Sequence, residues 1–335
     1  MKRTVAFIAA FAMLMTVCAC VPSAPAVPPK QTLSLTAMDT VMTLVAYTGD
    51  EGFLPSLQEE ITRCEGLFDA GDPASDVAKI NAADGPVTVS DETAAVLSAA
   101  FEANRLTGGA FDCTIAPVVD LWGFDTGNYG VPGKAEVQNA LLFTGGDAIT
   151  LDGTVVTRAP YAAVTLGGIA KGALGDRLMA LCEAAQVPAV LSLGGNIVLA
   201  GDNPHGGLWS VGVQSPTGSG IALSFSCEGG RSVVTSGGYE RYFEYQGKTY
   251  HHILDPKTGF PAESDLQSVT VIGTDGAMCD ALSTGLFVMG YEKAVAFAEE
   301  HDDFAYLFMT ADTVYTRGVQ NVELTEDGRT LITAE

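Results

Sequence analysis

Paired apolar segments joined by tight-turn dipeptides are the feature that most constrains the fold of this chain. Residues 148–151 and 154–159 flank Asp152-Gly153, a dipeptide that favours a two-residue hairpin. Two further hairpins are predicted: residues 231–245 with 248–253 around Gln246-Gly247, and residues 304–310 with 313–317. Because such hairpins outnumber possible βαβ crossovers, the sequence predicts an α+β fold with a largely antiparallel sheet.

Apolar residues with helical spacing occupy the segments between these hairpins. Residues 54–67 form one such segment, and Ser90 or Asp91 is suited to cap another at residues 91–106. Further helices are predicted for residues 137–142, for 167–185 after a glycine-rich start, for 277–289 and for 292–300. Further strands are predicted for residues 33–47, 189–193, 209–213 and 268–272.

Length and charge limit the class of protein. A chain of 335 residues can form one large domain or two small ones. Its formal net charge of −23 argues against nucleic-acid binding through a broad basic face. An anionic nucleotide can still bind where a metal ion or a helix N-terminus supplies local positive charge.

The N-terminus has the pattern of an export signal. Basic residues precede an apolar stretch at residues 4–17, which is too short to be taken first as a membrane-spanning helix. The segment Val17-Cys18-Ala19-Cys20 then resembles a bacterial lipobox, in which a small residue precedes the lipidated cysteine. We therefore expect a lipid anchor at Cys20.

This interpretation divides the chain into three parts. They are a lipoprotein signal peptide at residues 1–19, a proline-rich tether at 20–31 and one domain at 32–335. The protein would then be exported and anchored to the extracytoplasmic face of a membrane. The alternative is an ordinary signal peptide cleaved near Ala24 or Ala26.

The cysteines beyond this segment give no sign of a metal site. They are scattered, odd in number and without a CxxC pair, so neither a zinc site nor a disulfide framework is supported. We expect them to be small buried apolar side chains, although one disulfide is compatible with export. They are Cys64, Cys113, Cys182, Cys227 and Cys279.

Three glycine-rich segments are candidate ligand contacts. The first, TLGGIAKG, begins at Thr165 and leads into a helix, so its backbone can approach an anion closely, and Lys171 adds a cation. The alternative is a tight turn between a strand and a helix. The second, LSLGGN at residues 191–196, favours a structural bulge or turn. The third, TSGGYER at residues 235–241, could line a site or only bend the chain.

Two other segments carry side chains suited to catalysis or metal binding. His251 and His252 end a strand just before the turn sequence DPKTG, which would fix their positions. Asp280 and Thr284 are four residues apart and therefore face the same side of a helix. A carboxylate and a hydroxyl suit magnesium, which prefers hard oxygen ligands. The alternative is an N-capping aspartate with a buried threonine.

Taken in order, these segments resemble the ApbE family of FAD:protein FMN transferases. The resemblance extends from about residue 33 to about residue 309, and the occurrence of all the motifs in this order is specific. The matching segments are AMDT at 37–40, GAFD at 109–112, WGF at 122–124, GGIAKG at 167–172, LGGN at 193–196, TSG at 235–237, HILDP with TG at 252–259, and DALST at 280–284.

The resemblance implies a T-fold-related architecture, with a mixed, largely antiparallel sheet, flanking helices and FAD in a cleft between two lobes. It implies that FAD is contacted by Met38, Ala110, Phe111, Asp112, Thr165, Lys171 and the backbone near Leu254. The implied magnesium ligands are the carbonyl of Gly168 and the side chains of Asp280 and Thr284. His252 would line the reaction site.

The expected reaction is magnesium-dependent transfer of FMN from FAD to a Thr or Ser hydroxyl of an acceptor flavoprotein, with release of AMP. We expect the acceptor to be a redox subunit at the membrane, within reach of the tether. His252 is the candidate proton acceptor because its unperturbed pKa of about 6.5 suits proton transfer near neutral pH; positioning of FAD is its alternative role. Two other activities stay open, an FAD pyrophosphatase giving FMN and AMP, and a non-catalytic flavin-binding lipoprotein.

Overall fold

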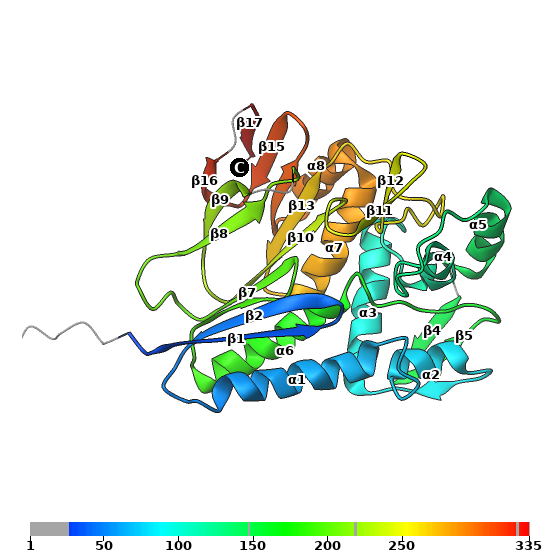
Figure 1. Cartoon of the computed structure of the whole chain (residues 1–335), viewed down its shortest axis with the longest axis horizontal. Helices are drawn as coiled ribbons and strands as arrows, with labels where there is room; N and C mark the ends of the chain where they lie inside the picture. Colours follow the sequence, from blue (N-terminus) through cyan, green and yellow to red (C-terminus); the bar gives the residue numbers. More distant parts are fainter. Residues whose placement is uncertain (1–26, 147, 218–219, 326–327, 335) are drawn as a thin grey trace, which may run out of the picture.

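The computed structural model describes residues 27–146, 148–217, 220–325 and 328–334. Within them, a nine-stranded sheet, three smaller sheets and flanking helices form the expected α+β fold (Figure 1). Cys20, the signal peptide assigned to residues 1–19 and most of the tether assigned to 20–31 lie outside the described residues. No helix in the described part of the chain is long and apolar enough to cross a bilayer.

The nine-stranded sheet is the centre of the fold. Its strand order is β1-β2-β6-β7-β10-β13-β14-β15-β17, and neighbouring strands are antiparallel except for the parallel pair β15 and β17. The bounds are β1 Lys30–Ala37, β2 Thr40–Tyr47, β6 Ala189–Ser192, β7 Asn196–Ala200, β10 Arg231–Gly237, β13 Ser268–Gly273, β14 Ala305–Met309, β15 Thr313–Arg317 and β17 Thr330–Ala334.

Helices cover one face of this sheet. α6 packs on β7 and α7 packs on β10 and β13, while α1 and α3 contact α6 and α7 respectively from further out (Figure 1). The first turn of α3 is capped as expected, because the hydroxyl of Ser90 accepts a hydrogen bond from Thr93 N–H at 3.2 Å. The bounds are α1 Phe53–Phe68, α3 Asp91–Leu106, α6 Ala170–Ala185 and α7 Gly276–Met289.

A three-stranded sheet of order β16-β9-β8 covers the opposite face. Trp209 and Phe225 from this small sheet pack against Leu199, Val233 and Leu307 of the large one. The neighbours of these residues along the large sheet point into the helical core instead, because side chains alternate between the two faces of a strand. The central strands are therefore buried on both faces. The bounds are β8 Trp209–Gln214, β9 Ile221–Cys227 and β16 Gln320–Leu324.

A group of smaller elements completes the fold. The helices α4 and α5 pack with the hairpin β11–β12 in an apolar cluster around Trp122, whose Nε1–H donates to the carbonyl of Gly259 at 2.9 Å. The remaining bounds are α2 Asp76–Ala82, β3 Val87–Thr88, η1 Cys113–Ile115, α4 Ala116–Trp122, α5 Lys134–Ala140, η2 Leu141–Phe143, β4 Ile149–Asp152, β5 Val155–Arg158, β11 Tyr242–Tyr245, β12 Lys248–His251 and α8 Tyr291–Glu300.

Two strands expected from the sequence are each divided in the structure. The segment 33–47 forms β1 and β2, because Met38 and Asp39 adopt positive φ angles of 47° and 57° and make a hairpin turn without glycine. The segment 231–245 splits because β10 joins the large sheet, whereas β11 pairs with β12 in a separate hairpin.

Candidate active site

One cleft brings together most of the side chains that the sequence singled out. It encloses about 950 Å³ of space between protein atoms, part of which is open to solvent. The expected contacts that line it are Ala110, Phe111, Asp112, Thr165, Gly168, Lys171, His252, Leu254, Asp280 and Thr284. Met38 lines a second cavity instead, which shares with the first the residues Gly167, Lys171, Glu240, Arg241 and His252.

A close approach of two helices builds the candidate metal site. A Cβ atom at Gly172 would lie 2.1 Å from the carbonyl oxygen of Gly276 and 2.7 Å from Cβ of Asp280, so only glycine lets α6 come this near to α7. The N–H of Gly172 donates to Oδ2 of Asp280 at 2.8 Å. Thr284 lies one turn further along the same side of α7, and both side chains face the cleft.

Gly168, Phe111 and Ser236 complete the corner around Thr284. A Cβ atom at Gly168 would be 3.6 Å from Thr284 Oγ1 and 3.1 Å from Cε2 of Phe111. From β10, the hydroxyl of Ser236 lies 2.7 Å from the hydroxyl of Ser283 and 3.4 Å from that of Thr284. The corner is therefore lined by closely spaced oxygen atoms beside an aromatic ring.

This set of donors fits magnesium. One carboxylate oxygen of Asp280 has no hydrogen-bond partner among the described residues, and Thr284 and Gly168 offer a hydroxyl and a carbonyl. Asp280 does not cap α7, since Asp275 does so by accepting from Met278 N–H at 2.9 Å. In the described ranges no three His, Cys, Asp or Glu side chains gather to hold a metal. A magnesium site here would combine one carboxylate with neutral oxygens.

His252 lies where the two cavities meet, directly after β12. Its backbone nitrogen and its Nδ1 each lie 3.1 Å from the carbonyl oxygen of Arg241. A carbonyl only accepts hydrogen bonds, so Nδ1 carries the ring proton and Nε2 keeps its lone pair. Burial, followed by the positive charge of Arg241, lowers the pKa of His252 to about 3. The imidazole is therefore neutral at pH 7 with a lone pair at Nε2, but burial makes it a weaker base than the ordinary pKa of about 6.5 expected from the sequence.

Met38 is held beside the second cavity by a strained turn. Its positive φ of 47° is unfavourable for a residue with a long side chain, whereas aspartate at position 39 tolerates the left-handed region better. The Met38 N–H donates to Oε1 of Glu65 on α1 at 2.6 Å, which fastens the turn to a helix. Gly194 packs directly behind the turn, since a Cβ atom there would lie 2.8 Å from Oγ1 of Thr40.

Hydrogen bonds to the end of α3 fix the segment that carries Phe111. Its N–H donates to Oγ1 of Thr107 at 3.0 Å, and its carbonyl accepts from Nδ2 of Asn104 at 2.8 Å. Asp112 then caps the next turn by accepting from Thr114 N–H at 2.8 Å. The ring of Phe111 and the carboxylate of Asp112 are thereby placed in the cleft wall.

Sequence reasoning gave no individual role to Asn196, Glu240 or Arg241, although all three line the cleft. The sequence marked them only as members of the second and third glycine-rich segments. The second segment was expected to be a structural bulge or turn, yet its Asn196 also lines the cleft. Burial raises the pKa of Glu240 to about 7, against the opposing effect of Lys171. The guanidinium of Arg241 donates to the carbonyl of Phe124 and so joins the β11–β12 hairpin to the end of α4.

Comparison with known proteins gives a consistent result. A model of the ApbE family matches residues 38–308. An FAD:protein FMN transferase of Klebsiella pneumoniae is 37% identical over 284 residues, which cover 83% of this chain and 88% of the relative. An FAD:protein FMN transferase of Treponema pallidum is 36% identical over 270 residues, which cover 74% of this chain and 74% of the relative.

Solved structures show the same architecture. The crystal structure of an ApbE protein from Thermotoga maritima superposes with a TM-score of 0.79 at 31% identity, covering 89% of this chain and 97% of that one. The flavin transferase ApbE from Vibrio cholerae superposes with a TM-score of 0.76 at 26% identity, covering 86% and 97%. The family match at residues 38–308 spans every residue that lines the two cavities.

Proposed function

This chain belongs to the ApbE family and transfers FMN from FAD to a protein, and we propose that the transfer requires Mg²⁺ held by Gly168, Asp280 and Thr284. The proposed acceptor group is a Thr or Ser hydroxyl, and AMP is the second product. One observation supports this most directly. A carboxylate with a free oxygen, the cation of Lys171 and the neutral imidazole of His252 converge in one cleft of a strongly acidic protein.

The proposed reaction exchanges one phosphorus–oxygen bond for another. The acceptor hydroxyl oxygen attacks the FMN-side phosphorus, and the bond from that phosphorus to the AMP phosphate oxygen breaks. Nε2 of His252 takes the hydroxyl proton, and AMP leaves with the electron pair of the broken bond. Bound magnesium would neutralise negative charge on the pyrophosphate.

Other residues of the cleft bind and orient FAD in this proposal. Lys171 lies in the first turn of α6, so its charge and the helix N-terminus both favour a phosphate. The ring of Phe111 offers an apolar face to an aromatic ring of FAD. Ala110, Asp112, Thr165 and the backbone at Leu254 complete the cleft wall, and Met38 contacts FAD from the second cavity.

Incubation with FAD, Mg²⁺ and an acceptor flavoprotein, read as flavin fluorescence of the denatured acceptor on a gel, tests the metal site. Asp280→Ala should abolish labelling, because it removes the only charged ligand proposed. Thr284→Ala should have a milder effect than Asp280→Ala, because a neutral hydroxyl contributes less to magnesium affinity than a carboxylate does. This variant should still label the acceptor, but it should need a higher magnesium concentration for half-maximal rate.

Asp303→Ala is the matched control, because this aspartate is exposed and does not line either cavity. It should label the acceptor at the wild-type rate and with the wild-type magnesium dependence. Full, magnesium-dependent labelling by Asp280→Ala would contradict the proposed ligand set. Wild-type labelling that is unaffected by removal of magnesium with a chelator would contradict the metal requirement itself.

We also propose that the protein is exported and anchored through lipid on Cys20, and that its acceptor is a redox subunit at the same membrane. This proposal is supported by the lipobox-like Val17-Cys18-Ala19-Cys20 and by the proline-rich segment that follows it. A membrane tether would keep the domain near acceptors that are themselves membrane-bound.

A further inference from the structure

A buried asparagine in the cleft has a hydrogen-bond donor without a partner. Asn196 is only 3% exposed, yet it lines the cleft. Its Nδ2 makes no hydrogen bond to any described residue. Buried polar groups are normally paired, so an unpaired amide at the wall of a binding cleft calls for an explanation. Since no acceptor of the described chain reaches this group, its partner is expected to arrive with the ligand.

The strand register places Asn196 next to the proposed reaction centre. Asn196 on β7 is directly opposite Val234 on β10, so the two side chains share the sheet face that packs on α6 and α7. Ser236 lies two residues further along β10 on the same face, and its hydroxyl is 3.4 Å from that of Thr284. Asn196 and Lys171 line the same cleft, into which α6 directs its N-terminus.

The charges in the cleft indicate which chemical group would meet the amide. Among the described residues, the cationic side chains that line either cavity are Lys171 and Arg241. His252 also lines both cavities, but it is neutral. The guanidinium of Arg241 already donates to the carbonyl of Phe124. A pyrophosphate that enters this acidic protein therefore meets few cationic side chains, and the N–H donor of Asn196 is suited only to an acceptor atom such as a phosphate oxygen.

We infer that Asn196 is a positioning residue whose side-chain amide donates a hydrogen bond to a phosphate oxygen of bound FAD. The inference rests on the proposed function and identifies a further residue of the same site. A rotation about the soft terminal torsion of asparagine turns Nδ2 toward the cleft that the side chain already lines. The bond fixes the pyrophosphate relative to Lys171 and His252, and it satisfies the buried donor.

The test measures affinity for FAD and for riboflavin, which lacks phosphate, without an acceptor protein. Asn196→Asp keeps the shape of the side chain but replaces the donor with an anion, and Asn196→Ala removes the group. Both variants should bind FAD about ten- to a hundredfold more weakly, because a hydrogen bond to a charged phosphate is lost. Both should bind riboflavin within about twofold of wild type.

Thermal unfolding separates this role from a structural one. In the absence of ligand, Asn196→Ala should melt near the wild-type temperature, because the deleted donor has no partner in the chain. Addition of FAD should then raise its melting temperature less than it raises that of wild type. Asn139→Asp, at an exposed position of α5, is the control for the added charge and should behave as wild type in every measurement.

Three outcomes would overturn the inference: wild-type affinity of both variants for FAD, equal weakening of FAD and riboflavin binding, or a large loss of stability in Asn196→Ala without ligand. Failure of the wild-type protein to bind FAD at all would instead overturn the proposed function.

Discussion

The division of roles between two adjacent histidines is decided by where their rings lie. His252 borders both cavities, with its Nδ1–H directed to the carbonyl of Arg241. His251 lines neither cavity, and its ring packs edge-on against Phe287 with centroids 5.7 Å apart. Its Nε2 lies 3.2 Å from the carbonyl of Ala262, which accepts a hydrogen bond in the matching tautomer. One ring therefore faces the ligand space and the other faces the core.

His252→Ala should lower the rate of FMN transfer by about 100- to 10,000-fold, the usual contribution of a general base. The affinity for FAD, measured by fluorescence titration, should change much less. Because the lowered pKa leaves His252 unprotonated, the wild-type rate should show no loss from this group as the pH falls from 8 to 6.

His251→Ala is the matched control, and its rate per folded molecule should stay near wild type although some stability is lost. If His252→Ala loses FAD binding in proportion to its rate, the residue positions the nucleotide and is not the base. If both variants transfer FMN normally, the base must be sought elsewhere in the cleft.

Residues of the site differ in how far the sequence could identify them. Helical spacing puts Asp280 and Thr284 on one side of α7, but spacing alone left the N-capping alternative open, and their proposed role as ligands came from the family resemblance. Lys171 was identifiable because a cation follows glycines at a helix start. Asn196 was not, because its place in the cleft depends on its register with β10, and the sequence contains no signal for the pairing of distant strands.

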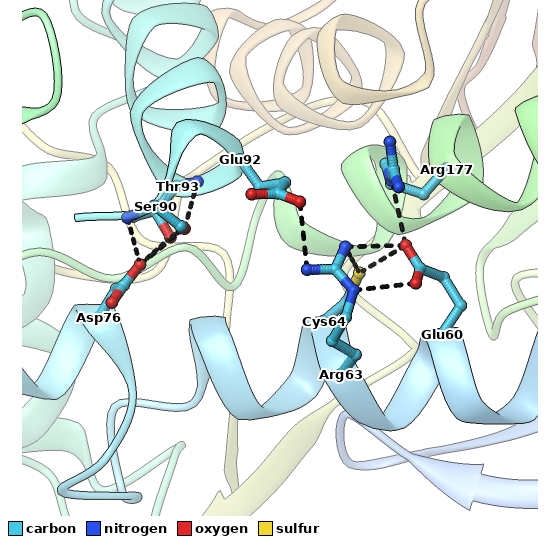
Figure 2. Close-up of polar contacts among 8 residues, drawn as sticks. All are labelled: Glu60, Arg63, Cys64, Asp76, Ser90, Glu92, Thr93 and Arg177. Atoms are coloured by element: carbon cyan, nitrogen blue, oxygen red, sulfur yellow. Dashed lines mark hydrogen bonds and ion pairs between the residues drawn. The ribbon is translucent and has the colours of Figure 1, made fainter.

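At the scale of elements, one ion-pair cluster joins three helices around the core. Figure 2 shows Glu60 of α1 between two arginines: Arg63 donates to both carboxylate oxygens at 2.8 and 2.9 Å, and Arg177 of α6 donates at 3.0 Å. Arg63 also pairs with Glu92 of α3 at 3.1 Å. The hydrogen bond from Arg63, aided by that from Arg177, lowers the pKa of Glu60 to about 2 despite partial burial.

Replacement of Glu60 by glutamine should lower the free energy of unfolding at pH 7 by about 1–2 kcal/mol. This is less than the full pKa shift would give, because both arginines are partly exposed and solvent screens their charges. The folded pKa lies below the ordinary value, so the stabilisation is complete above about pH 4.5 and disappears as the pH falls toward 2. Urea unfolding of both proteins at pH 7 and pH 3 should therefore show a smaller difference at pH 3.

Glu59→Gln provides the control, since Glu59 is the exposed neighbour of Glu60 on the same helix. Its effect should be within about 0.5 kcal/mol of zero at either pH, as is usual for surface substitutions. A difference between wild type and Glu60→Gln that is equal at pH 7 and pH 3 would show that the carboxylate charge does not stabilise the helices.

The elements with local signals were predictable, and those that depend on distant pairing were not. The helix at Asp91–Leu106 has the expected bounds because Ser90 caps it and apolar spacing continues to its end. The division between β1 and β2 has only a weak signal, since Asp39 is a common residue of left-handed turns but Met38 is not. The parallel pairing of β17 with β15 likewise has no local signal. No pattern within either segment predicts that the two strands become neighbours in the sheet.

At the scale of the molecule, the first strand connects the proposed anchor with the site. β1 is an edge strand that starts at Lys30, so it includes the last two residues that were assigned to the tether. It ends beside the turn at Met38, which lines the second cavity. Its eight residues span about 26 Å. The proposed tether therefore enters the domain through β1, and the far end of this strand borders the second cavity.

Cys20→Ala should release the protein from membranes, because the substitution removes the only residue proposed to carry lipid. Fractionation of cells that express each protein, followed by immunoblotting, should find wild type with the membranes and the variant in the soluble fraction. The released variant should still transfer FMN to a soluble acceptor at the wild-type rate, since none of the described residues that line either cavity comes from the tether. Transfer to a membrane-bound acceptor should slow, because tethering raises the local concentration of the two partners. A variant that stays with the membranes, together with a wild-type N-terminal peptide that carries no acyl group in mass spectrometry, would show that the anchor is absent and that the ordinary signal peptide is the correct interpretation.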